Sequence, residues 1–106
     1  MVIEWLEFRV PADQRERYVQ LDEEIWTPAL RRYPGFLSKE TWLDPTDAEL
    51  VSLMIRWRSR EEWKAISETD LTAIEVQFDQ ALGVAYTLEN AREFQVRRFP
   101  VGPRAD

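Results

Sequence analysis

Three residues spaced four apart, Tyr18, Asp22 and Trp26, are the best candidates in this sequence for acid–base chemistry. In a helix, side chains four positions apart lie on the same side, so the Asp22 carboxyl group is expected between two aromatic rings. If that side faces a pocket, loss of hydration raises the pKa of Asp22 and makes its carboxylate a general base near neutral pH. The alternative is that Asp22 lies at the border of the apolar stripe and points into water.

Large aromatic side chains are the second group of candidates, because pockets for small aromatic molecules are lined mainly by such rings. We predict that the substrate pocket is lined by Tyr18, Trp26, Tyr33, Trp57 and Phe78. Tyr33 could instead cover the end of a helix, and Trp57 could be a core ring with no contact to a ligand.

Pairs of adjacent charged residues are weaker candidates. The carboxylates of Glu23-Glu24 and of Glu61-Glu62 do not face each other on a helix, so a solvated face is expected for both pairs. Arg97-Arg98 could hold an anionic ligand, but consecutive strand residues point to opposite faces, so at most one of them serves a given site.

The composition excludes several classes of site. The 106 residues include neither Cys nor His, and the formal net charge is −6. A disulfide, a thiolate nucleophile, a His-ligated haem or zinc and a Ser-His-Asp triad are therefore excluded. The acidic balance disfavours a nucleic-acid partner, and no apolar run is long enough to cross a membrane. We expect a cytoplasmic protein without a metal or cofactor.

Hydrophobic periodicity predicts one domain over residues 1–100 and a loose tail at 101–106. Four strands are expected, at residues 2–10, 36–43, 50–58 and 92–99. The second and third strands are separated by a turn rich in Asp and Pro, which predicts a hairpin.

Helices are expected after the first strand and after the third strand. Asp13 should cap the first helix, and Thr27 should cap a redirected second piece over residues 28–32. Ser59 and Glu62 form a capping box for a short helix that ends at residue 66. A longer helix follows, with an apolar stripe and a stop at Gly83.

The order strand-helix-strand-strand-helix-strand favours an α+β, ferredoxin-like βαββαβ fold, in which one four-stranded antiparallel sheet carries all helices on one face. The alternation within the third strand assigns Val51, Leu53, Ile55 and Trp57 to the helix side. The other face would be left open, with Trp5 and Met54 exposed and Leu37 as a further candidate. An apolar patch of that kind predicts a homodimer formed through the open sheet face.

Four segments give the chain a family resemblance over residues 3–99. They are Tyr33-Pro34-Gly35-Phe36, Trp57-Arg58-Ser59-Arg60-Glu61-Glu62-Trp63, Glu24-Ile25-Trp26-Thr27 and Arg92-Glu93-Phe94-Gln95-Val96-Arg97. With these segments the chain resembles the antibiotic biosynthesis monooxygenase (ABM-like) superfamily, and most closely a small, functionally uncharacterised ABM-like family.

The resemblance implies a dimeric α+β barrel with a small cavity between the sheet and the helices of each subunit. Cofactor-independent oxygenases of this superfamily deprotonate a phenolic substrate, whose anion then reacts with oxygen. Members often use an Asn on the first strand, where this chain has Glu4 and Glu7; its one Asn is Asn90. The haem-degrading relatives need a His ligand, so the resemblance does not extend to their activity.

The leading hypothesis is therefore a homodimer that binds a small phenol- or quinol-like aromatic molecule and oxidises it as a cofactor-independent monooxygenase, with Asp22 as the base. The first alternative is a non-catalytic ligand-binding or regulatory dimer of the same fold, which the missing His, Cys and strand Asn favour. The second alternative is a structural dimer whose cavity is filled by its own Trp and Tyr side chains.

Overall fold

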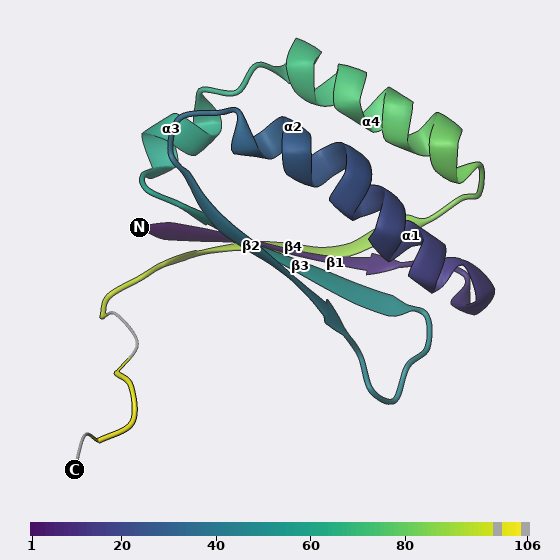
Figure 1. The fold of residues 1–106 in the computed structure, drawn as a ribbon, viewed down its shortest axis with the longest axis horizontal. Helices are drawn as coiled ribbons and strands as arrows, with labels where there is room; N and C mark the ends of the chain where they lie inside the picture. The colour runs from purple at the N-terminus through teal and green to yellow at the C-terminus, as the bar shows by residue number, and fades with distance from the viewer. Residues whose placement is uncertain (99–100, 105–106) are drawn as a thin grey trace.

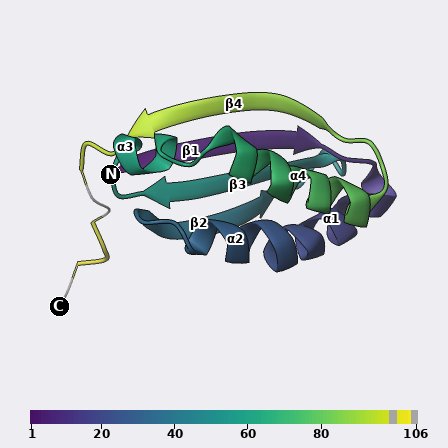
Figure 2. The same ribbon diagram turned by 90° about the horizontal axis from the view of Figure 1, so that it is seen from above.

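The fold is the ferredoxin-like α+β arrangement, seen in a computed structural model that describes residues 1–98 and 101–104 (Figure 1). One antiparallel sheet with the strand order β2-β3-β1-β4 is formed by β1 (Val2–Arg9), β2 (Phe36–Leu43), β3 (Leu50–Trp57) and β4 (Thr87–Gln95). The helices all cover the same face of the sheet, as Figures 1 and 2 show. They are α1 (Arg15–Leu21), α2 (Thr27–Arg31), α3 (Arg60–Lys64) and α4 (Glu68–Leu82).

Strand register decides which side chains face the helices. Residues Val51, Leu53, Ile55 and Trp57 of β3 pair with Phe8, Leu6, Glu4 and Val2 of β1, and these four β3 side chains are buried. The alternate residues of the two strands form the open face. The assignment of alternate β3 residues to the two faces is therefore confirmed. The expected exposure of Met54 on the open face is wrong, because that residue is only 3% exposed.

The first helical region is more continuous than expected. A 3-10 turn at Ala12–Gln14 leads into α1, and a π-helical segment, Asp22–Trp26, joins α1 to α2. The predicted caps are wrong, because neither this turn nor either helix has a side-chain cap at its start. Thr27 has helical dihedral angles instead, and Pro28 fits the first turn of α2 because it needs no acceptor for an N–H.

The short helix after β3 begins at Ser59, as predicted. The Ser59 hydroxyl accepts a hydrogen bond from the Glu62 N–H at 3.2 Å and caps α3. The Glu62 carboxylate accepts from the Ser59 hydroxyl at 3.0 Å, rather than from the backbone as in a full capping box. Ser67 caps α4 through the Asp70 N–H, and Gly83 ends that helix with a φ of 72°.

Two of the four segments that carry the sequence resemblance, residues 33–36 and 57–63, meet at Gly35. This residue has a φ of +91°, and a Cβ at this position would lie 2.6 Å from the Cβ of Glu62. Its carbonyl oxygen accepts a hydrogen bond from the Arg58 N–H at 2.7 Å. Only glycine combines this conformation with so close an approach, which joins the start of β2 to the start of α3.

The fourth strand begins earlier than predicted. It was expected over residues 92–99, but β4 spans Thr87–Gln95, because pairing with β1 runs from Val2–Gln95 to Arg9–Thr87. Phe99 lies outside the described residues. Every residue of β4 is exposed, so neither of its faces has to be apolar. Its sequence therefore lacks the alternation of apolar and polar residues by which the start of a strand is predicted.

Candidate functional site

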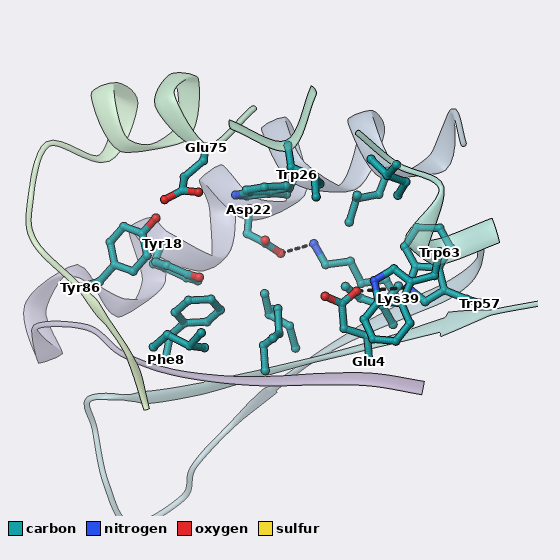
Figure 3. A pocket seen from close by; sticks show the side chains of 17 residues that line it. Glu4, Phe8, Tyr18, Asp22, Trp26, Lys39, Trp57, Trp63, Glu75 and Tyr86 are labelled. Atoms are coloured by element: carbon teal, nitrogen blue, oxygen red, sulfur yellow. Dashed lines mark hydrogen bonds and ion pairs between the residues drawn. The ribbon is translucent and has the colours of Figure 1, made fainter. Parts of the chain in front are cut away.

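A cavity of about 330 Å³ lies between the helix-facing side of the sheet and the helices (Figure 3). Its volume is at the lower end of the ~300–1,000 Å³ typical of small-molecule sites. Most of its lining is aliphatic or aromatic. The aromatic members are Phe8, Tyr18, Trp26, Trp57, Trp63 and Tyr86. The fold thus leaves a partly open, mainly apolar space between the sheet and the helices.

An ion pair between Asp22 and Lys39 crosses this cavity from the helical layer to the sheet (Figure 3). The Lys39 Nζ donates to Asp22 Oδ2 at 2.6 Å and to Thr27 Oγ1 at 2.8 Å. The two charged side chains are only 4% and 1% exposed. Asp22 and Trp26 mark the ends of the π-helical segment, a local geometry that is often found at functional sites.

The second carboxylate oxygen of Asp22 has no hydrogen-bond partner among the described residues, although it is buried. Burial raises the pKa of Asp22, and the ammonium group of Lys39 opposes part of that increase. The alternative in which Asp22 points into water is wrong. The site contains a buried acceptor, Oδ1, that a ligand could satisfy.

Glu4 is a second carboxylate in the lining, and it is half-buried. It reaches the cavity from β1, and its Oε1 accepts a hydrogen bond from the Trp57 Nε1 at 3.2 Å. Burial raises the pKa of Glu4, whereas the Trp57 hydrogen bond and the charges of Lys64 and Lys39 lower it. Strand register explains why Glu4 and Lys39 lie on the same side of the sheet. Both residues pair with Ile55 and so share a row across the helix-facing side.

Two tyrosines form a wall of the cavity with Phe8. The Tyr18 and Tyr86 rings pack edge to face with centroids 5.5 Å apart, and each also contacts Phe8. Burial raises the pKa of both phenols, and the hydrogen bond from Tyr86 to Asp79 adds to this effect for Tyr86. Both rings are therefore suited to packing against a ligand and, as neutral phenols, are poor bases.

Comparison with protein families matches residues 1–73 to the antibiotic biosynthesis monooxygenase family. The chain belongs to this family. No curated protein matches the ABM chain. No helix of its described part is both long enough and apolar enough to span a membrane.

Solved structures with the ABM fold resemble this chain along nearly its whole length. A proposed antibiotic biosynthesis monooxygenase from Deinococcus radiodurans has a TM-score of 0.70 and 17% identity, over 95% of this chain and 97% of that one. SnoaB, a cofactor-independent oxygenase from Streptomyces nogalater, has a TM-score of 0.66 and 14% identity, over 92% and 94%. A proposed ABM protein from Chloroflexus aurantiacus has 0.64 and 21%, over 98% and 96%. At these identities the likeness shows the fold.

Four of the six predicted site residues lie in the lining of the ABM cavity, namely Tyr18, Asp22, Trp26 and Trp57. Phe78 and Tyr33 do not line it. Phe78 is fully buried against the Tyr18 ring, with centroids 5.1 Å apart, and the Tyr33 hydroxyl donates to Asp70 at 3.1 Å. Phe78 lies behind the cavity wall because Tyr18 occupies the space in front of it.

The polar residues Lys39 and Glu4 escape prediction from the sequence, although each leaves a signal. Glu4 interrupts the apolar side of β1, which otherwise presents Val2, Leu6 and Phe8 to the helices. Lys39 occupies a helix-facing position of β2. A charged residue at a core-facing strand position is costly to bury unless it has a partner. A charge at such a position in the sequence therefore indicates a partner or a ligand nearby.

Proposed function

We propose that this ABM protein is a cofactor-independent monooxygenase that acts on a small phenol- or quinol-like aromatic molecule in the cavity described above. The observation that carries the proposal is the free Oδ1 of buried Asp22 beside the Lys39 ammonium group, within a mainly apolar, aromatic lining. SnoaB, which has the same fold, is a cofactor-independent oxygenase, and this supports the reaction class.

A phenolic hydroxyl is complementary to this pair of polar groups. Its O–H donates to Asp22 Oδ1, and its oxygen accepts the third N–H of Lys39, whose other two hydrogen bonds go to Asp22 and Thr27. Asp22 takes the proton as a general base, and the ammonium group stabilises the phenolate by charge at short range. The rings of Tyr18 and Trp26 hold the substrate plane and exclude water.

The electron-rich phenolate then reduces molecular oxygen. One electron passes to oxygen, and the resulting radical and superoxide combine through a new carbon–oxygen bond. Loss of water from the hydroperoxide, with cleavage of the oxygen–oxygen bond, leaves a quinone. In total, a phenol with a free ring position and one O₂ give one quinone and one water, so atoms and electrons balance with oxygen as the sole oxidant.

A binding module without turnover is the second candidate. The observation that favours it is the engagement of Asp22 Oδ2 by Lys39, because a carboxylate that is already paired with an ammonium group is a weaker base. The same cavity would then hold an aromatic ligand through the same hydrogen bonds and leave it chemically unchanged.

Oxygen uptake and ligand binding, measured on the same panel of phenols and quinols, distinguish these two functions. Binding is followed by quenching of Trp fluorescence, since three Trp residues line the cavity. Asp22→Asn should lower turnover by at least about 100-fold, a typical contribution of a general base, while binding changes by less than about tenfold. Glu24→Gln, an exposed charge change in the same π-helical segment, is the matched control and should keep wild-type turnover.

Wild-type protein that binds the panel but consumes no oxygen would establish the binding module in place of the enzyme. Turnover that survives Asp22→Asn would remove Asp22 from the role of base.

The proposal includes a homodimer formed through the open sheet face. A groove on this face is lined by Trp5, Trp42, Met54 and Phe94, with Arg56 and Arg92 among its polar members. Trp42 and Phe94 are 45% and 41% exposed. Aromatic residues, Met and Arg are the types enriched at protein interfaces, and a second copy of the same face would cover them symmetrically.

A further inference from the structure

We propose that Glu4 is a second recognition group in this cavity, and that it selects a neutral aromatic ligand with two hydrogen-bond donors over an aromatic carboxylate. A dihydroxyarene is the simplest ligand of this class. The inference rests on the proposed function, since it takes one hydroxyl of the ligand to be bound at Asp22, and it names the chemistry that the rest of the ligand should carry.

The position of Glu4 makes such a contact possible. Figure 3 shows the side chain of Glu4 rising from the sheet and that of Asp22, paired with Lys39, descending from the helical layer, and both carboxylates line the same cavity. The charge of Lys39 acts on both carboxyl groups, which agrees with this placement. A ligand whose first hydroxyl lies at Asp22 therefore has Glu4 within reach of an adjacent part of its ring system.

The hydrogen bonds of Glu4 leave it one oxygen for a ligand. Oε1 accepts from the Trp57 indole N–H, which fixes the orientation of the carboxylate. Among the described residues, Oε2 has no hydrogen-bond donor. A second hydroxyl or an amino group on the ligand would satisfy this oxygen, and hydrogen bonds to a charged acceptor are stronger than those between neutral groups.

The charges around the cavity disfavour an anionic ligand. Among the described lining residues, three carry carboxylates (Glu4, Asp22 and Glu75) and one, Lys39, carries an ammonium group. Lys39 is already paired with Asp22, and Lys64, whose charge also acts on Glu4, does not line the cavity, so a ligand carboxylate near Glu4 would meet an excess of negative charge in a partly desolvated space. Neutral donors meet no such penalty.

The test compares three ligands that share one ring system: a naphthol, the same naphthol with a second hydroxyl, and the same naphthol with a carboxylate in that place. Affinities for wild type and Glu4→Gln are measured by Trp fluorescence without oxygen, so that no turnover is needed. Glutamine keeps the shape and can still accept from Trp57. Glu4→Gln should weaken the diol by about tenfold, leave the naphthol within about twofold, and strengthen the hydroxy-acid by about tenfold.

Glu7→Gln is the matched control, because Glu7 lies on the same strand, faces the open side and pairs with Asn90. This variant makes the same change in net charge and should bind all three ligands as wild type does. Equal changes for all three ligands in Glu4→Gln, or none, would overturn the selective role of Glu4 while leaving the proposed function in place. No binding of any of the three to wild type would overturn both proposals.

Discussion

The two faces of the sheet each carry an ion pair, and the pairs start from adjacent residues of β2. Lys39 points to the helices and pairs with Asp22 at 2.6 Å, whereas Glu40 points to the open side and pairs with Arg56 at 2.8 Å. Their distances are similar, but the exposed fractions are 4% and 1% for the first pair and 49% and 33% for the second. Surrounding water screens charge, so an exposed ion pair contributes less to stability than a buried one of similar geometry. The burial of each pair, and not its N–O distance, therefore decides which one matters more for stability.

Breaking the buried pair should have the largest effect on stability. Lys39→Met leaves the Asp22 carboxylate in an apolar space without a partner, and the free energy of unfolding should fall by about 3–5 kcal/mol. Arg56→Met removes a cation from the exposed pair and should change the stability little, because Glu40 stays in contact with water. Urea denaturation of both variants under the same conditions measures the difference.

The double variant Asp22→Leu with Lys39→Met controls for packing. Replacing a buried ion pair by apolar residues is often neutral or stabilising, so this variant should recover most of the stability lost in Lys39→Met. Equal losses of stability in Lys39→Met and Arg56→Met would show that burial does not decide the contributions of the two ion pairs.

The open face of the sheet should differ from the exposed surface of α4 in its response to a new charge. Trp42→Glu places a carboxylate in the apolar groove, and we expect dimer dissociation to become at least about tenfold easier, or about 1.4 kcal/mol. Val76→Glu is the control, because Val76 is similarly exposed, at 48%, but lies on α4. Sedimentation velocity over a range of protein concentrations gives both dissociation constants.

A wild-type protein that sediments as a monomer at all concentrations would contradict the proposed dimer directly. Equal weakening by Trp42→Glu and Val76→Glu would place the interface elsewhere.

Local sequence signals were sufficient to predict most of the fold. Ser59 and Gly83 mark helix ends through their own side-chain and backbone chemistry, and the apolar residues of β3 alternate over a full strand. Two elements could not be predicted in this way. The limits of β4 depend on its pairing with β1, and the π-helical segment, whose Asp22 pairs with Lys39 of β2, has no local signal of this kind.

The candidate site was predicted mainly on its helical side for the same reason, and Trp57 is the one lining residue on the sheet that was predicted. Tyr18, Asp22 and Trp26 follow from a spacing of four within one segment. Lys39 and Glu4 come from two strands that are not neighbours in the sheet, and only the register of both with Ile55 brings them to one row. Contacts of this kind depend on strand order, which no short stretch of sequence encodes.

The smallest expected effect is a difference in the pH dependence of stability between the two faces. Burial raises the pKa of Glu4, so between its ordinary value of about 4 and its raised value the folded protein binds more protons than the unfolded chain. Glu4 therefore contributes increasing stability as pH falls through this interval. The Arg56 hydrogen bond lowers the pKa of Glu40, so the contribution of Glu40 is instead lost as the solution becomes acidic.

Urea denaturation of wild type, Glu4→Gln and Glu40→Gln over about pH 3 to pH 8 tests this opposition of signs. Compared with wild type, Glu4→Gln should gain less stability on acidification from neutral pH, with a difference in slope below about 1.4 kcal/mol per pH unit, the limit for one group. Glu40→Gln should lose less stability at acidic pH than wild type does. Curves that shift in the same direction in both variants would contradict the assignment of Glu4 to a desolvated site and of Glu40 to a solvated one.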